Sequence, residues 1–209
     1  MKTALKLGDA LQGKRLLIFD FDGTVADTAP LHAAAFSQVL APLGIEVDYS
    51  CIAGLKTVEA LLLCFADAEL STPDTQTLTD LVLEKQRRVR ALINEMLTPL
   101  PGVDEFLLWA KTRYTIALVT SGSRGTVELA INKLGWMGWF DQMLFAEDVV
   151  HAKPNPEGFL RVLEMTGIAA EEALVFEDSE VGFKAAKAAG INFIDAQKFD
   201  WALTDSAFP

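Results

Sequence analysis

Two pairs of acidic residues stand out, because each pair directly follows a short apolar run. They are Asp20 and Asp22 after residues 16–19, and Glu177 and Asp178 after residues 173–176. Such runs have the length of buried strands, and open α/β sheets bind ligands at the carboxyl ends of their strands. Carboxylates in one crevice repel one another unless a cation or a shared proton relieves them. The pattern indicates carboxylate chemistry at a divalent metal, although Asp22-Gly23 alone is also typical of an ordinary turn.

Two further segments carry groups suited to an anion. The turn Thr120-Ser121-Gly122-Ser123 offers hydroxyls and free backbone N–H groups at the expected start of a helix. Lys153 precedes a proline, which restricts the lysine to an extended backbone. The alternatives are a plain helix cap at the turn and a solvated surface lysine. Because both segments lie between the two acid pairs, we expect all of them to share one site.

Strands and helices alternate through the second half of the chain, and these elements would position the polar groups. We expect strands over 16–19, 115–120, 142–146, 173–176 and 191–194, and helices over 103–111, 125–134, 156–166 and 181–189. Repeated strand–helix units predict an α/β fold with a doubly wound parallel (Rossmann-like) sheet.

A block of helices interrupts this alternation after the first strand. Apolar residues recur at helical spacing over 30–43, 58–68 and 75–96, and no strand is expected between Pro30 and Thr98. We therefore predict a core domain of residues 1–28 and 99–209 and an inserted α-helical domain of residues 29–98.

Composition excludes several classes of partner. The 209 residues carry a net charge of −11, which disfavours nucleic acid and anionic membranes, and no apolar stretch approaches the ~18 residues of a membrane span. Cys51 and Cys64 show no pairing pattern and are expected to be buried or half-buried thiols. The first residues lack the apolar core of a signal peptide. We expect a cytoplasmic protein, and a monomer because its helical domain is self-contained.

Taken together, the residues resemble the haloacid dehalogenase-like phosphatase superfamily. The motifs that carry the resemblance are DFDGT from Asp20, the Thr120-Ser121 strand end, Lys153 before proline, and Glu177-Asp178. Their order and spacing fit over nearly the whole chain, and the helical insertion resembles the C1-type cap of that family. The segments 27–32, 119–123 and 176–179 are most similar to its sugar-phosphate phosphatase and β-phosphoglucomutase branch.

The resemblance implies a reaction through an aspartyl-phosphate. Asp20 would be the nucleophile, and Asp22 the general acid and then the general base. Mg²⁺ would be the cofactor, and its ligands would be Asp20, the Asp22 carbonyl and Asp178, with Glu177 holding a metal-bound water. The phosphoryl group would be met by Thr120, Ser121, Gly122 and Lys153. Either hydroxyl could be the main one; Thr120 stands at the strand end, where the family's motif belongs.

The same resemblance points to four residues of the helical domain that would face the substrate: His32, Gly54, Lys56 and Lys85. Lys85 falls where the sugar-phosphate enzymes place a substrate-contacting lysine, and His32 matches a histidine beside the acid/base. The alternatives are a solvated helix face for Lys85 and a purely structural role for His32.

The function expected is a Mg²⁺-dependent phosphatase acting on a small phosphorylated metabolite, a sugar or polyol phosphate. The alternative is a β-phosphoglucomutase-like phosphotransferase. Those mutases carry an arginine shortly after the glycine of the cap, whereas Gly54 is followed here by Leu55-Lys56-Thr57. The missing arginine argues against a mutase, unless Lys56 takes its place. A non-catalytic binding protein on the same fold is a third possibility. The intact acids and lysine argue against it.

Overall fold

Five short strands form a parallel sheet at the centre of the computed structural model, which describes residues 7–201. The strands are β1 (Leu16–Phe19), β2 (Thr115–Val119), β3 (Gln142–Leu144), β4 (Ala173–Glu177) and β5 (Asn192–Asp195), in the order β3-β2-β1-β4-β5. All neighbouring strands run parallel. The strand order reverses beside β1, where such sheets bind ligands. The predicted doubly wound α/β sheet is confirmed.

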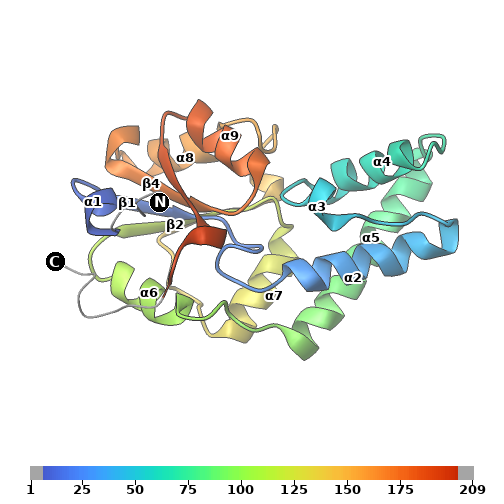
Figure 1. The fold of residues 1–209 in the computed structure, drawn as a ribbon, viewed down its shortest axis with the longest axis horizontal. Coiled ribbons are helices and arrows are strands. Elements are labelled where there is room, and N and C mark those ends of the chain that lie inside the picture. The colour runs from blue at the N-terminus through green and yellow to red at the C-terminus, as the bar shows by residue number, and fades with distance from the viewer. Residues whose placement is uncertain (1–6, 202–209) are drawn as a thin grey trace, which may run out of the picture.

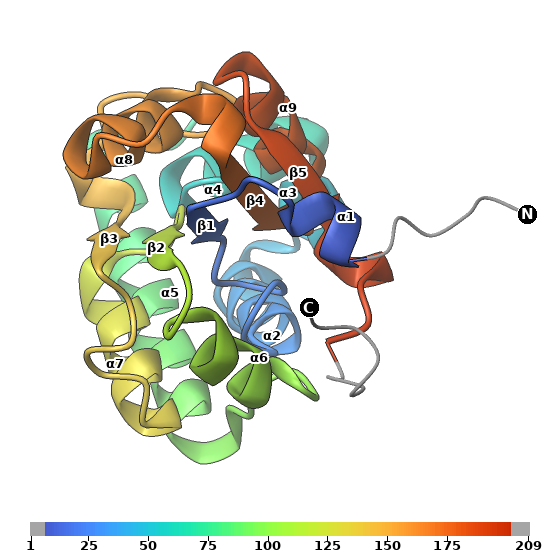
Figure 2. The same ribbon diagram turned by 90° about the vertical axis from the view of Figure 1, so that its left-hand side faces the viewer.

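Helices cover both faces of the sheet, which is why its central strands read as continuous apolar runs. The covering helices are α6 (Val103–Ala110) and α7 (Arg124–Leu134) on one face, and α8 (Glu157–Thr166) and α9 (Glu180–Ala188) on the other (Figure 2). Alternate residues of β1 serve the two faces. Leu17 and Phe19 join the apolar cluster of α6 and α7, and Leu16 and Ile18 join that of α8 and α9.

Between β1 and α6 the named elements are all helices, and these project from one end of the sheet (Figure 1). They are α2 (Ala29–Leu40), α3 (Tyr49–Ile52), α4 (Thr57–Asp67) and α5 (Thr75–Met96), which we call the helical insert. The insert has an apolar cluster of its own, in which Phe36, Leu61 and Phe65 are buried. The predicted helical insertion is confirmed, while its division from the core at residues 28/29 and 98/99 stays a prediction. The predicted core ranges also extend past both ends of the described residues.

The two chain segments that lead into and out of the insert lie side by side. The Asp27 N–H donates to the Thr98 carbonyl at 3.2 Å, and the Leu100 N–H donates to the Val25 carbonyl at 3.3 Å. Ala26 and Pro99 form an antiparallel bridge between these hydrogen bonds. The insert therefore leaves and re-enters the core at one place.

Several details differ from the expectations. The helices α1 (Leu7–Leu11) and α3 were not predicted, because segments of five and four residues are too short to show a helical period. Short 3₁₀ turns lie at Ala41–Leu43, Ala146–Asp148, Ala170–Glu172 and Ala196–Lys198. Cys64 is buried as expected, but Cys51 is exposed. In the described part of the chain, no helix is both long and apolar enough to cross a membrane.

Candidate active site

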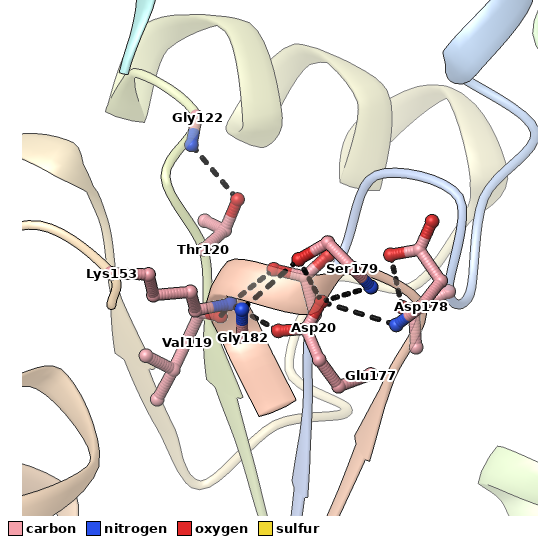
Figure 3. Close-up of polar contacts among 10 residues, drawn as sticks. Asp20, Val119, Thr120, Gly122, Lys153, Glu177, Asp178, Ser179 and Gly182 are labelled. Carbon is pink, nitrogen blue, oxygen red and sulfur yellow. Dashed lines mark hydrogen bonds and ion pairs between the residues drawn. The ribbon is translucent and has the colours of Figure 1, made fainter. Parts of the chain in front are cut away.

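The two acid pairs meet because β1 and β4 are neighbours in register. Phe19 pairs with Phe176, and the Asp20 N–H donates to the Phe176 carbonyl at 3.0 Å, so Asp20 stands beside Glu177 at the carboxyl edge of the sheet. Asp20, Glu177 and Asp178 each offer an oxygen, and these atoms lie within 4.8 Å of one another (Figure 3). Asp20 and Glu177 are buried. The register of two strands thus gathers the carboxylates that the sequence placed 157 residues apart.

Lys153 binds the acids from the loop after β3. Its Nζ donates to Asp20 Oδ1 at 2.6 Å, to Glu177 Oε2 at 2.7 Å and to the carbonyl of Val119 at 3.0 Å (Figure 3). Burial lowers the pKa of Lys153, but the two carboxylates outweigh it and hold that pKa above its ordinary value. All three N–H donors of a charged ammonium are therefore in use, and the ammonium joins the ends of β1, β2 and β4.

Glu177 is held by donors on both of its oxygens. Oε1 accepts from the N–H groups of Asp178 and Ser179, each at 3.1 Å, and from Ser179 Oγ at 2.9 Å, while Oε2 accepts from Lys153. A Cβ at Gly182 would lie 2.0 Å from Oε2, so only glycine leaves room for this carboxylate. Glu177 therefore positions Lys153 and the turn at Asp178. Its predicted hold on a metal-bound water stays a prediction.

The remaining acids fit a hard divalent cation. Burial raises the pKa of Asp20, and Glu177 raises it further, against the opposing effect of Lys153. Burial, with Glu177 next, raises the pKa of Asp178 to about 7. Asp178 Oδ1 accepts from Thr24 Oγ1 at 3.1 Å, and a Cβ at Gly23 would lie 2.5 Å from Oδ2. A cation would relieve this repulsion, and carboxylate and carbonyl oxygens are the ligands that Mg²⁺ prefers.

Asp22 is contacted by Thr28, which directly precedes α2, and by His32 within α2. Oδ1 accepts from Thr28 Oγ1 at 2.6 Å and lies 3.4 Å from His32 Nε2. Lys85 Nζ lies 2.9 Å from His32 Nδ1, and since an ammonium can only donate, Nδ1 accepts and the ring hydrogen sits on Nε2, facing Asp22. Burial, and then Lys85, lower the pKa of His32 to about 4, so the ring is neutral. A chain of polar contacts therefore runs from Lys85 to Asp22.

Lys85 is buried, with only 3% of its surface exposed, so a solvated helix face is the wrong description. Its Nζ lies 4.5 Å from the centroid of the Phe36 ring. Burial lowers the pKa of Lys85 to about 8, although Asp22 opposes the shift. A lysine that loses basicity on folding destabilises the fold wherever it is charged in both states.

We expect Lys85→Met to raise the free energy of unfolding at pH 7 by about 1 to 2 kcal/mol. Relieving the buried charge gives about 3 kcal/mol, from which the lost contacts to His32 and Phe36 subtract about 1 to 2 kcal/mol. The gain shrinks as pH rises from 8 to 10.5, where the wild-type lysine sheds its proton on folding. Urea denaturation at pH 7 and pH 10 measures the gain in stability and its decrease with pH. The control is Lys184→Met, at an exposed position. A destabilised Lys85→Met protein would contradict the assignment.

The turn after β2 faces the acids. Thr120 Oγ1 accepts from the Gly122 N–H at 2.9 Å, which leaves the hydroxyl hydrogen free to donate to a ligand and commits that N–H within the turn (Figure 3). Ser121 and Gly122 line the cavity that also contains Asp20 and Asp22. The predicted phosphate contacts of Thr120, Ser121, Gly122 and Lys153 stay predictions.

Three of the four predicted residues of the insert, His32, Gly54 and Lys85, line the cavity of Asp20 and Asp22. The fourth, Lys56, instead lines an adjoining cavity with Thr120 and Lys153 and donates from Nζ to the Val149 carbonyl at 3.1 Å. A Cβ at Gly54 would lie 2.7 Å from Ser179 Oγ, so the insert reaches the acid turn of the core here. Through these contacts the helical insert borders the site.

Sequence reasoning missed the hydroxyls that orient the acids. Thr24 Oγ1 donates to Asp178, 154 residues further along the chain. Thr28 and Ser179 orient Asp22 and Glu177. Thr24 lies within the first motif, and Thr28 and Ser179 lie within six positions of the acids that they contact. A search for hydroxyl side chains near the two acid pairs would therefore have found all three.

Comparison with known proteins agrees with this geometry. The family model described as haloacid dehalogenase-like hydrolase matches residues 17–196. Fructose-1-phosphate phosphatase YqaB of Escherichia coli is 33% identical over 181 residues, which cover 87% of this chain and 95% of that protein. A phosphorylated carbohydrates phosphatase of Thermotoga maritima is 35% identical over 182 residues, covering 85% and 82%. The crystal structure of β-phosphoglucomutase from Clostridium difficile has a TM-score of 0.79 at 25% identity, covering 86% and 83%.

The fold and the matched residues define the class: the chain belongs to the haloacid dehalogenase-like hydrolase family. Within that family it is a phosphatase, a phosphoric monoester hydrolase. The resemblance inferred from the four motifs is confirmed.

Proposed function

We propose that the protein is a Mg²⁺-dependent phosphatase that hydrolyses sugar or polyol phosphates through an aspartyl-phosphate. The observation that carries the proposal is the contact of the Lys153 ammonium with Asp20 at 2.6 Å, beside Asp22 held by Thr28. A nucleophile with a fixed cation and a separately oriented acid has the parts that phosphoryl transfer requires. Relatives named for fructose 1-phosphate and for phosphorylated carbohydrates support the substrate class.

The reaction proceeds in two displacements. An Asp20 carboxylate oxygen attacks phosphorus and the bond to the leaving oxygen breaks, while protonated Asp22 gives its proton to that oxygen. Asp22 then takes a proton from water, whose oxygen attacks phosphorus and releases the Asp20 carboxylate and inorganic phosphate. Thr28 and the neutral His32 keep Asp22 directed at the leaving oxygen, and Lys153 holds Asp20.

Asp20, Asp178 and the Asp22 carbonyl would hold Mg²⁺, since the first two lie in the cluster of oxygens described above. When bound, the ion supplies positive charge against the phosphoryl oxygens, which otherwise repel an approaching carboxylate.

Asp178→Asn tests this ligand assignment. The amide keeps the shape of the side chain but loses its charge, so the Mg²⁺ concentration for half-maximal activity is expected to rise at least about tenfold. The measurement is a metal titration of phosphate release, and Asp80→Asn, on an exposed part of α5, is the control. Activity that persists in Asp178→Asn without any need for metal would refute the assignment.

The function itself is tested by measuring phosphate release from sugar, polyol and nucleotide monophosphates, with Mg²⁺ and with chelator. The panel includes β-glucose 1-phosphate, coupled to detection of glucose 6-phosphate with and without a bisphosphate primer. Mg²⁺-dependent phosphate release is the expected result. Glucose 6-phosphate formed without free phosphate would identify a mutase instead, which the likeness to β-phosphoglucomutase makes the second candidate. If neither phosphate nor glucose 6-phosphate is formed, both enzyme functions are contradicted.

A further inference from the structure

The cavity over Asp20 and Asp22 is bounded on its far side by the helical insert. Its empty volume is about 540 Å³, and its wall includes Tyr49 from α3, Thr57 from the first turn of α4 and Gln86 from α5. These residues come from three separate helices, so the fold of the insert, and no local motif, brings them together. None of them carries a role in the reaction as described above.

The polar groups of these three side chains lack protein partners. Within residues 7–201, the Tyr49 hydroxyl, the Thr57 hydroxyl and the Gln86 carboxamide make no hydrogen bond to the protein, and all three residues are half-buried. The Tyr49 ring is supported by Phe36, with ring centroids 6.4 Å apart. Polar groups in a partly closed cavity are normally paired, so these three are available to a ligand.

The hydroxyl of Tyr49 remains a donor at neutral pH. Burial raises its pKa, and the negative charges of Asp22, Asp178 and Asp20 raise it further. The residue lines the same cavity as Asp20 and Asp22. A neutral hydroxyl at this position can donate to, or accept from, a hydroxyl of the group that leaves phosphorus.

The cavity offers little to a second anion. Among the described residues that line it, Lys85 is the only lysine or arginine, and it is a buried one whose Nζ donates to His32 Nδ1 and lies over the ring of Phe36. A carboxylate or a second phosphate in the leaving group would lose its hydration there, would meet this single lysine as the only cationic side chain of the wall, and would face Asp20 and Asp22.

Resting on the phosphatase activity proposed above, we infer that Tyr49, Thr57 and Gln86 form a subsite for the hydroxyls of the leaving group. This subsite selects phosphate monoesters of uncharged polyols over bisphosphates and phosphorylated carboxylates. A site whose buried polar groups pair with substrate hydroxyls discriminates against analogues that lack them, because the unpaired groups are left desolvated.

Tyr49→Phe tests the subsite, because it removes the hydroxyl and keeps the ring on Phe36. The readout is kcat/KM for sorbitol 6-phosphate divided by that for p-nitrophenyl phosphate, whose leaving group carries no further hydroxyl. We expect this ratio to fall roughly three- to tenfold, the effect of losing one neutral hydrogen bond. Gln86→Leu is expected to lower it similarly. The other tyrosine, Tyr114, packs on Trp109 in the core, so Tyr114→Phe is the matched control and should keep the wild-type ratio.

The outcomes separate this inference from the proposed function. An unchanged ratio in both Tyr49→Phe and Gln86→Leu would overturn the subsite, as would a wild-type preference for fructose 1,6-bisphosphate or phosphoglycolate over sorbitol and glucose 6-phosphates. Hydrolysis of p-nitrophenyl phosphate but of no sugar or polyol phosphate would overturn the subsite while leaving a phosphatase. Hydrolysis of none of these esters in the presence of Mg²⁺ would overturn the proposed function together with the subsite.

Discussion

Asp20→Asn is expected to reduce turnover below detection while leaving the protein folded. The amide has almost the shape of the carboxylate and keeps an oxygen for Lys153, but it cannot displace the leaving oxygen from phosphorus. Loss of the covalent route should remove most of the ~8 kcal/mol or more by which enzymes lower barriers, a factor of roughly 10⁶ in rate. Phosphate release under saturating Mg²⁺ measures this loss.

The control for this prediction separates chemistry from folding. Thermal unfolding of Asp20→Asn should resemble that of the wild-type protein, and Asp67→Asn, at the exposed end of α4, should keep full activity. Wild-type turnover in Asp20→Asn would contradict an aspartyl-phosphate mechanism. Asp20 would then only position Lys153, and another residue would have to be the nucleophile.

Lys153→Met is expected to affect both activity and stability. The ammonium meets Asp20 and Glu177 at 2.6 and 2.7 Å in a buried position, so its removal leaves two buried carboxyl groups without their cation. We expect kcat to fall about 10²- to 10³-fold, because a fixed charge beside the transferring phosphoryl group is lost. The free energy of unfolding at pH 7 should fall by about 3 kcal/mol, the lower range for breaking a buried pair.

The stability loss in Lys153→Met should depend on pH in a defined direction. Burial already raises the pKa of Asp20, and without Lys153 it rises further. A carboxyl whose pKa is raised in the folded state stabilises the protein at low pH and loses that contribution as pH increases. The deficit against wild type should therefore be small near pH 4 and large at pH 7 in urea denaturation. Lys187→Met on the exposed side of α9 is the control, and a deficit independent of pH would contradict the interpretation.

The sequence predicted the frame of the site well, since local patterns determine it. The run Leu16–Phe19 is apolar throughout because both faces of β1 are covered, and the acids that follow it had to emerge at the sheet edge. The helix over Thr75–Met96 was predicted with its observed bounds because its apolar period is long, and in the structure the Asp74 side chain caps its start.

The orientation of the side chains could not be predicted in the same way. Lys85 lies on an amphipathic helix rich in charged residues, and only the packing of α2 against α5 buries it over Phe36. Tyr49 sits in a four-residue helix with no periodic signal, and Glu177 is enclosed because Gly182 leaves it space. These features depend on contacts between segments far apart in the chain, which propensity and spacing do not encode.

The paired segments at Val25–Asp27 and Thr98–Leu100 have a consequence for how the protein can evolve. Since the insert departs and returns at adjacent points, a segment of any length whose ends meet in the same way could occupy its place without disturbing β1 or β2. The residues that perform the reaction lie almost entirely outside that segment. Substrate preference and catalysis can therefore evolve separately, the first in the helical insert and the second in the rest of the chain. Exchanging residues 28–97 between related proteins should transfer the substrate preference in one step.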